Sequence, residues 1–338
     1  MRPGSEVVVN VVPTAGQSNQ IYNVTPKTVF TGFHARLTGT YTEGASAQQI
    51  LAWAPLGFLR RLELNLGGGS PLLSADGRLH YFWNAYTRGG GTQGVLIPPL
   101  GGANQVTNIE ANIWLDIMRY DLHPPYNTSF FLNARALATL MFIADYGGTA
   151  DIDAAASGGT FSNMNLTITA EEWQDVTGEG SYSQLTKRQF VPIATGDMSP
   201  GIDLQCGGPI YRGVVLHAVS GAADPNQTPL IGDDTVISAV SLITDNGVRI
   251  MDHVPWATVQ ARNRTISSWQ GAWPPGFAVL DWAYDHSIRH ELVTVNRNSL
   301  TVVPTIGALP ANAQILVYTI NDLLVQRKPQ GTAKGRRR

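Results

Sequence analysis

Apolar and polar residues alternate along two distant segments of the chain, and each segment predicts a β-hairpin. The first, Phe58–Ser74, contains a run of three glycines, and the second, Val236–Asp252, contains an Asp-Asn-Gly turn. Period-two alternation is typical of a half-buried strand, and Gly or Asn-Gly supplies the positive φ of a tight turn. The glycines that end the two turns, Gly69 and Gly247, are 178 residues apart, which indicates an internal duplication. The residues predicted to face inward are Leu62, Leu64, Leu66, Val240 and Leu242.

Further segments match at a similar separation. We expect one pair to open each half as strands and another pair to form a short helix in each half. About eight strands per half, in the same order, predict an all-β fold of two tandem eight-stranded jelly rolls with short helices in the loops. The matched segments are Phe33–Tyr41 with Tyr211–Val219, Leu79–Tyr86 with Val254–Arg262, Ile113–Asp116 with Ala278–Asp281, and the closing strands 137–143 and 165–169 with 300–304 and 314–320.

Length and composition agree with two β domains. The 338 residues suit two domains of about 150 residues each. Charged residues make up 14% of the chain, and 35 glycines and 20 prolines are spread along it, which is typical of a turn-rich globular protein. We expect the first jelly roll at residues 1–178, the second at 179–326 and a flexible basic arm at 327–338. A polar linker is expected at 175–200.

Cysteine content and hydropathy narrow the class of protein. Cys206 is the only cysteine, so an intrachain disulfide and a cysteine-based zinc site are excluded. We expect Cys206 to be a buried or idle thiol. The N-terminal residues show no apolar stretch of signal-peptide length, and no run of 18 apolar residues occurs; the expectation is a protein that is neither secreted by that route nor membrane-spanning.

The charge is distributed unevenly. The last twelve residues hold six of the 23 basic side chains and no acidic ones, which leaves 17 basic against 25 acidic residues, or −8, for the rest. A basic tail on an acidic body predicts contact with an anionic surface such as nucleic acid or lipid headgroups. A solvated tail that keeps the protein soluble is the alternative. The basic residues are Arg327, Lys328, Lys334, Arg336, Arg337 and Arg338.

Motifs for nucleotide, metal or nucleophile chemistry are absent from the sequence or incomplete. Neither a P-loop nor a Gly-x-Ser-x-Gly elbow occurs. His286 and His290 have the spacing of zinc ligands but lack the glutamate between them that a metalloprotease uses as a base. Asp151 and Asp153 offer oxygen ligands without the further ligands of a calcium site, so we expect a polar loop. The sequence therefore predicts no metal and no cofactor.

Acidic and aromatic residues leave one enzymatic alternative open. Glu171, Glu172, Asp116 and Asp281 include carboxylates that could converge as in a glycosidase. Asp116 and Asp281 recur at corresponding places in both halves, which favours a hydrogen bond at a turn or strand end over catalysis. The eight tryptophans suit either a sugar-stacking surface or the core and subunit interfaces, and we favour the second. No catalytic residue is predicted, and we expect a protein that is not an enzyme.

The segment Arg60–Tyr81, with its strand, glycine turn, second strand and helix, resembles the double jelly-roll major capsid proteins of tailless icosahedral viruses. This is the lineage of adenovirus hexon and of the coats of membrane-containing phages, and the resemblance covers nearly the whole chain. It implies a homotrimer that forms a pseudo-hexagonal tile of the virion shell, made in the host cytoplasm. The implied partners are further copies, neighbouring capsomers, penton or minor capsid proteins, and an internal membrane or the genome through the basic arm.

Two alternatives remain at this stage. One is a two-domain jelly-roll protein that binds or processes carbohydrate, which requires clustered acids and exposed tryptophans. The other is a minor capsid or spike protein on the same fold.

Overall fold

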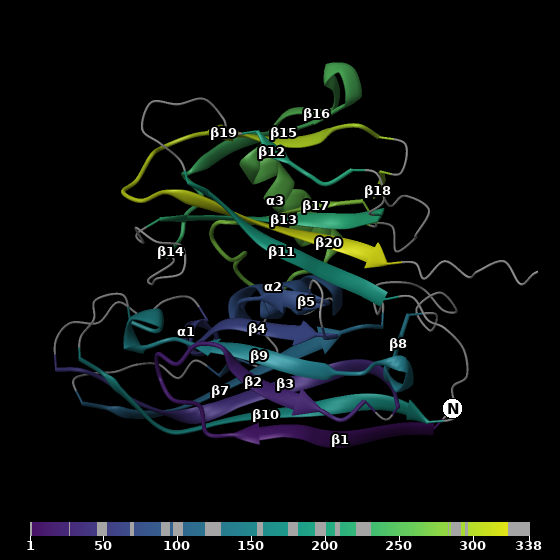
Figure 1. Cartoon of the computed structure of the whole chain (residues 1–338). Coiled ribbons are helices and arrows are strands. Elements are labelled where there is room, and N and C mark those ends of the chain that lie inside the picture. The colour runs from purple at the N-terminus through teal and green to yellow at the C-terminus, as the bar shows by residue number, and fades with distance from the viewer. Residues whose placement is uncertain are drawn as a thin grey trace, which may run out of the picture.

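The computed structural model describes most of the chain, and strands dominate it. Figure 1 shows two stacked β bodies, with the strands of the first half below and those of the second half above. The described residues are 2–26, 28–45, 53–67, 71–88, 95–96, 104–118, 130–153, 158–174, 182–192, 201–206, 210–220, 231–282, 284, 292–294 and 297–323.

The first half consists of two antiparallel sheets. One has the order β1-β10-β3-β7, and the other has the order β2-β9-β4-β5. The short strands β6 and β8 pair with β7 and β3. The bounds are β1 Arg2–Val11, β2 Gln20–Val24, β3 Val29–Thr42, β4 Leu59–Asn65, β5 Leu73–Ala75, β6 Val95–Leu96, β7 Val106–Asp116, β8 Leu132–Asn133, β9 Leu140–Tyr146 and β10 Thr160–Gln174, with helices α1 Ala54–Gly57 and α2 Gly77–Arg88.

The second half repeats this arrangement. One sheet has the order β11-β20-β13, with β17 on the other side of β13, and the other has the order β12-β19-β15-β16. The short strands β14 and β18 both pair with β13. The bounds are β11 Tyr182–Pro192, β12 Ile202–Asp203, β13 Ile210–Ser220, β14 Ile231–Gly232, β15 Ile237–Thr244, β16 Val248–Pro255, β17 Phe277–Asp281, β18 Leu292–Val293, β19 Leu300–Ile306 and β20 Gln314–Leu323, with helix α3 Trp256–Ile266.

The strand order confirms the predicted fold class. Within the described residues, and setting aside β6, β8, β14 and β18, eight strands remain in each half. In both halves the first, eighth, third and sixth of these strands form one sheet, and the second, seventh, fourth and fifth form the other. This is the arrangement of a jelly roll, and the chain contains it twice.

Alternation along β3 and β13 shows how each half buries its core. Inward side chains of both strands are at most 1% exposed, and outward ones face solvent or the other half. Gly32 of β3 lies opposite Asp116 of β7, and Gly213 of β13 lies opposite Asp281 of β17. This register aligns the two halves residue by residue. The inward residues are Phe33, Ala35 and Leu37 on β3, and Val214, Leu216 and Ala218 on β13.

Both predicted hairpins and both predicted helices are present. Strands β4 and β5 pair, as do β15 and β16, and the turns use positive φ at Gly67 (82°) and Gly247 (77°). Gly69 lies outside the described residues. Leu62, Leu64, Val240 and Leu242 are fully buried, and Leu66 is partly buried.

Two expectations about the order of elements were wrong. The segments at Phe33 and Tyr211 do not open the halves, because β1 and β2 precede one and β11 and β12 precede the other. The predicted linker, 175–200, contains β11 (Tyr182–Pro192), which pairs with β20 along its length. The described strands numbered β1 to β10 pair only with one another, and those numbered β11 to β20 pair only with one another. The boundary at 178/179 stays a prediction.

No helix among the described residues is long and apolar enough to cross a membrane. Cys206 is partly buried, its thiol lies 3.7 Å from the carbonyl oxygen of Leu204, and burial raises its pKa.

Candidate functional site: the seam between the halves

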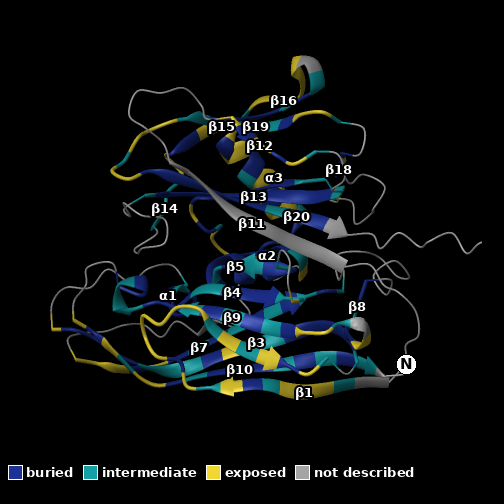
Figure 2. Cartoon of the chain, in the orientation of Figure 1, coloured by how far each residue is buried: buried dark blue, intermediate teal, exposed yellow. Residues whose placement is uncertain are grey.

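Helix α2 lies between the two halves (Figure 1) and is buried almost along its whole length. Residues 77–86 are all buried, whereas α3 exposes about half of its residues to solvent (Figure 2). A helix that is apolar on several sides must be covered on several sides. We call the contact surface between the halves the seam; it joins α2 and Trp53 to β13, β17, β20 and residues 267–277.

Aromatic rings fill the centre of the seam. Phe82 of α2 stacks on Phe277 of β17 with a centroid distance of 4.4 Å, and it lies 5.5 Å from Trp273 and 5.8 Å from Trp269. Trp53 lies 5.9 Å from Phe277. One buried hydrophobic cluster therefore runs from the first half into the second. The two halves share a core instead of merely touching.

Hydrogen bonds between polar side chains cross the seam along α2. Asp76, just before the helix, accepts a hydrogen bond from the amide of Leu79 at 2.9 Å and another from the Tyr318 hydroxyl at 2.6 Å. Near the other end of α2, the Tyr86 hydroxyl donates to Asp281 at 2.8 Å. Burial, and then the charge of Asp281, raise the pKa of Tyr86 well above its usual value. Both hydrogen bonds thus join a carboxylate of one half to a tyrosine hydroxyl of the other.

A cation of the second half also contacts α2. The Arg212 guanidinium of β13 stacks over the Trp83 ring of α2 at 4.5 Å. Both side chains are less than 10% exposed, so this cation–π contact is largely desolvated and stronger than an exposed one.

The two duplicated aspartates both contact α2. Asp116 and Asp281 end their strands opposite glycines, as the register shows. Asp116 accepts hydrogen bonds from Arg88 Nε at 3.0 Å and from Asn84 Nδ2 at 3.3 Å, and Asp281 accepts from Tyr86. The expectation of hydrogen-bonded carboxylates at strand ends is confirmed.

Two asparagines that the sequence analysis did not single out repeat the same contact in both halves. The side-chain oxygen of Asn84 accepts the amide of Trp114 at 2.8 Å, and that of Asn263 accepts the amide of Val279 at 2.8 Å. Trp114 and Val279 each stand two residues before the duplicated aspartate. Each asparagine side chain therefore accepts a hydrogen bond from a backbone amide at a strand edge. Without it, that amide would need a partner from a neighbouring strand. The sequence did contain a signal for this contact, because asparagine recurs at a separation of 179 residues.

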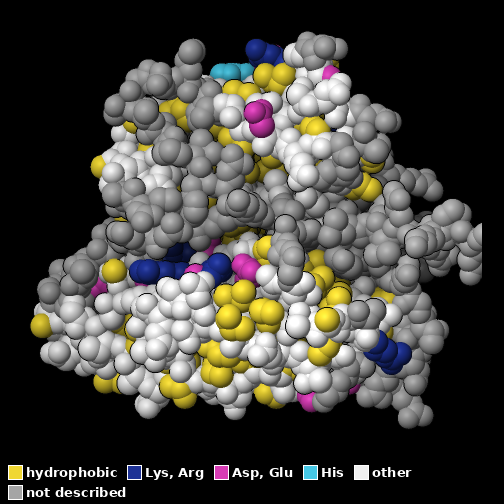
Figure 3. Space-filling model, in the orientation of Figure 1, with side chains coloured by type: hydrophobic (Ala, Val, Ile, Leu, Met, Phe, Trp, Pro, Cys, Tyr) yellow, Lys and Arg dark blue, Asp and Glu magenta, His cyan; other side chains and the backbone are white. Residues whose placement is uncertain are grey.

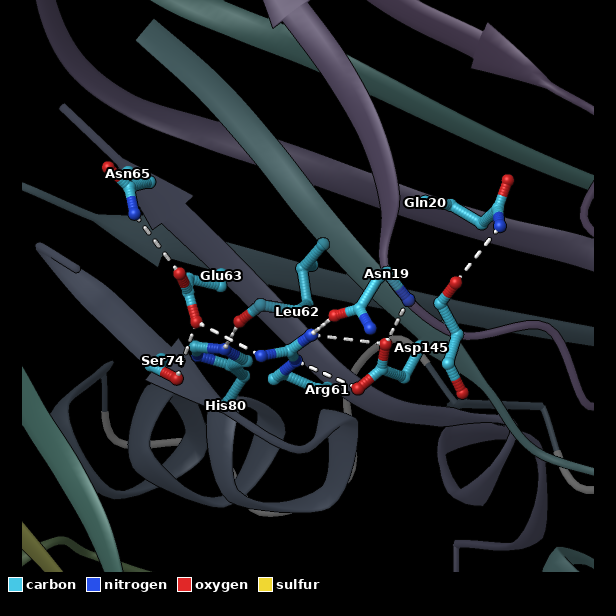
Figure 4. A network of polar contacts seen from close by, with 10 residues as sticks. Asn19, Gln20, Arg61, Leu62, Glu63, Asn65, Ser74, His80 and Asp145 are labelled. Carbon is cyan, nitrogen blue, oxygen red and sulfur yellow. Dashed lines mark hydrogen bonds and ion pairs between the residues drawn. The ribbon is translucent and has the colours of Figure 1, made fainter. Parts of the chain in front are cut away.

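A network of charged and polar side chains covers β4 and β9 near the seam (Figure 4). Arg61 pairs with Asp145 at 2.8 Å and lies 3.7 Å from Glu63. Glu63 accepts a hydrogen bond from Ser74 of β5 at 3.2 Å. Figure 3 shows basic and acidic side chains in a row where the halves meet. These contacts tie three strands together, and His80 of α2 bonds to the Leu62 carbonyl beneath them at 3.0 Å.

Asp151 and Asp153 do not form the predicted polar loop, because both are fully buried. Asp151 pairs with Arg60 at 3.1 Å and accepts the amide of Gly148 at 2.7 Å. Burial of a carboxylate requires such partners. Of the remaining acids, Glu172 is buried and accepts a hydrogen bond from Thr28 at 2.8 Å.

Tryptophan placement favours the core over a sugar-binding surface. All eight tryptophans are described, and none of them is exposed. Trp83, Trp256 and Trp269 are buried, and the other five are partly buried.

Two predicted features fall on residues that the structure does not describe. His286 and His290 lie outside the described residues, and elsewhere in the described part of the chain no group of three or more His, Cys, Asp or Glu could hold a metal ion. The basic residues of the arm, Arg327 to Arg338, also lie outside the described residues.

Comparison with known proteins gives a likeness in structure only. No family model and no curated protein matches the sequence. The major capsid protein of Sulfolobus turreted icosahedral virus superposes over 96% of this chain and 98% of that chain, with a TM-score of 0.70 and 16% identity. The major capsid protein P2 of bacteriophage PM2 covers 96% and 99%, with a TM-score of 0.62 and 12% identity. The capsid of virus PBCV-1 covers 95% and 93%, with a TM-score of 0.62 and 10% identity. The chain therefore has the double jelly-roll fold of these capsid proteins.

Proposed function

We propose that this protein is the major capsid protein of an icosahedral virus and forms the virion shell. The observation that carries the proposal is the pair of jelly rolls with identical strand order, joined by a buried seam. Solved capsid proteins match this arrangement along nearly the whole chain. A shared core holds the two halves in one orientation, as a shell subunit requires. The role is structural, without catalysis.

The proposed assembly is a homotrimer in which six jelly rolls form a pseudo-hexagonal tile. Each copy supplies two units of the same fold, so three copies supply six. Its partners are then other copies, neighbouring tiles, and penton or minor capsid proteins at special positions of the shell.

Light scattering on the purified chain, with negative-stain images of the same sample, tests this function. We expect a mass of three times 36.4 kDa, or tiles and closed shells. A monomer at every concentration would refute it. The carbohydrate alternative needs exposed tryptophans, and the protein has none.

The basic arm at 327–338 is proposed to face an internal membrane or the genome. Its six cations and lack of acids suit phosphate groups, which lipid headgroups and nucleic acid share. Deletion of these residues should leave the oligomer intact and abolish binding either to anionic vesicles or to nucleic acid, and the affected ligand identifies the surface. Unchanged binding of both would exclude this role.

A further inference from the structure

Helix α2 carries a buried histidine on the side that packs on the first half (Figure 4). His80 is 2% exposed, and its Nε2 lies 3.0 Å from the carbonyl oxygen of Leu62 on β4. It lies one helical turn before Asn84, which contacts β7. Phe82 and Tyr86 lie on another side of the helix and contact the second half. Helix α2 therefore joins the halves, and His80 is among the residues that hold it to the first.

The second half shows that the fold does not need a histidine at this position. Asn84 corresponds to Asn263, because each accepts the amide two residues before a duplicated aspartate. His80 then corresponds to Val259 of α3, which is buried in the core of the second half. Of the two equivalent helices, the one in the seam has a titratable side chain here and the other has a valine. A buried imidazole that packing does not require is a candidate for a functional group.

The charges on α2 itself give a protonated His80 little compensation. Asp76 attracts a cation, but it already accepts hydrogen bonds from the Leu79 amide and the Tyr318 hydroxyl. Arg78 is buried and repels a second cation. Burial therefore outweighs the hydrogen bond to the backbone of β4 and the charge of Asp76, and it lowers the pKa of His80 from 6.5.

The acids on the neighbouring elements are already paired. Glu63 lies 3.7 Å from Arg61, Asp116 accepts from Arg88, and Asp281 accepts from Tyr86. The short elements α1 and β5 have no charged residue. The charged and titratable groups on the elements packed against α2 are Arg61 and Glu63 on β4, Asp116 on β7, Arg212 and His217 on β13, Asp281 on β17 and Tyr318 on β20.

We propose that the seam is acid-sensitive: protonation of His80 loosens α2 from β4 and lets the two jelly rolls open apart. Opening exposes the imidazole to water, so the open form binds the proton more tightly than the closed form. The open population therefore rises as pH falls below 6.5. If the closed form stays unprotonated, the rise from pH 7 to pH 5 is about 25-fold. In a coat protein this opening would loosen the shell in acid, and that consequence alone rests on the proposed function.

Thiol labelling of the full-length chain measures opening of the seam. In a Cys206→Ser background, Val215→Cys places a thiol on the face of β13 that joins the shared core, and Val214→Cys places one in the core of the second half. Both valines are fully buried. Rates with a disulfide reagent are divided, at each pH, by the rate of Val12→Cys, whose site is highly exposed. This ratio removes the pH dependence of thiol reactivity itself.

At Val215→Cys we expect the relative rate to rise roughly tenfold or more between pH 7 and pH 5, with a much smaller rise at Val214→Cys. His80→Gln, which keeps a hydrogen-bond donor, and His80→Val, which introduces the residue of α3, should each abolish the rise. The matched control is His217→Gln, which changes another buried histidine of the seam and should leave the rise in place.

Three results would overturn the inference. Equal rises at the two valine sites would mean that the whole chain unfolds. A rise that survives in either His80 variant, or that His217→Gln removes, would assign the effect to other groups. A relative rate that does not change with pH would mean that the seam stays closed. Each of these leaves the coat function standing, because the mass of the protein at pH 7 tests that function separately.

Discussion

Replacing Phe82 by alanine removes the side chain at the centre of the shared core. Phe82 is fully buried and stacks on Phe277 at 4.4 Å, with Trp273 and Trp269 within 6 Å. A buried Phe→Ala change costs about 3–5 kcal/mol, and an aromatic pair adds about 0.5–1.5 kcal/mol beyond its buried area. Because three aromatic partners come from the second half, we expect a loss of about 5 kcal/mol in the free energy of unfolding.

Urea unfolding at one protein concentration, followed by tryptophan fluorescence and far-UV circular dichroism, measures this loss. The matched control is Phe142→Ala, which removes an equally buried ring that packs on Phe33 within the first half, at 5.1 Å. We expect both variants to lose stability, but only Phe82→Ala to separate the two transitions, because it uncouples the halves. A loss below about 1 kcal/mol for Phe82→Ala would refute the shared core. Coincident transitions in both variants would show that Phe82 is not what couples the halves.

Four further substitutions test individual contacts. Asn84→Ala and Asn263→Ala should each cost about 1–3 kcal/mol in urea unfolding, because each leaves a strand amide unpaired. Burial lowers the pKa of His80 below 6.5, so the unfolded chain binds the proton first and stability falls as pH drops below 6.5; His80→Gln should reduce the shift in Tm between pH 7 and pH 5. Asp151→Ala should cost about 1.5–3 kcal/mol and lower Tm, because the change removes the charged partner of Arg60.

A specific experimental outcome would contradict each of these predictions. Wild-type stability in either asparagine variant would mean that water replaces the side-chain amide at the strand edge. An unchanged pH dependence in His80→Gln would assign it to other groups. For Asp151, the control is Asp145→Ala on the partly exposed pair with Arg61, and a larger loss there would contradict the ranking by burial.

Local sequence patterns were sufficient to predict the elements whose own residues show apolar alternation and a turn. Each predicted hairpin has apolar alternation and a glycine or Asn-Gly turn, and both formed. Strand β11 was missed because its sequence, with Thr-Lys-Arg-Gln at its centre, lacks such alternation and becomes a strand by pairing with β20. Tertiary context decides such segments.

Local sequence patterns could not predict the seam. Tyr86 and Asp281 are 195 residues apart, and nothing near either residue indicates the other. The burial of Asp151 likewise depends on Arg60, which stands 91 residues earlier. The sequence did indicate that the tryptophans suit the core and that the duplicated aspartates are structural, because those conclusions follow from residue type and from recurrence.

The positions at which the two halves keep the same residue show what the duplicated fold requires. Some core positions have changed: Ala35 corresponds to Leu216 and Leu37 to Ala218, a reciprocal exchange that conserves volume, which a core tolerates. Leu115 and Leu280, both buried, correspond and are identical. The identical polar and glycine pairs instead contact backbone or lie against it. Each asparagine binds a strand amide, each aspartate ends a strand, and each glycine lies opposite that aspartate. A side chain that bonds to backbone must match a fixed geometry, whereas one that fills volume can exchange with its neighbour. The duplication is therefore best recognised by a few residues that recur at separations of 165 to 181, and the apolar pattern between them reports mainly the strands. These identical pairs are Gly32 with Gly213, Asn84 with Asn263 and Asp116 with Asp281.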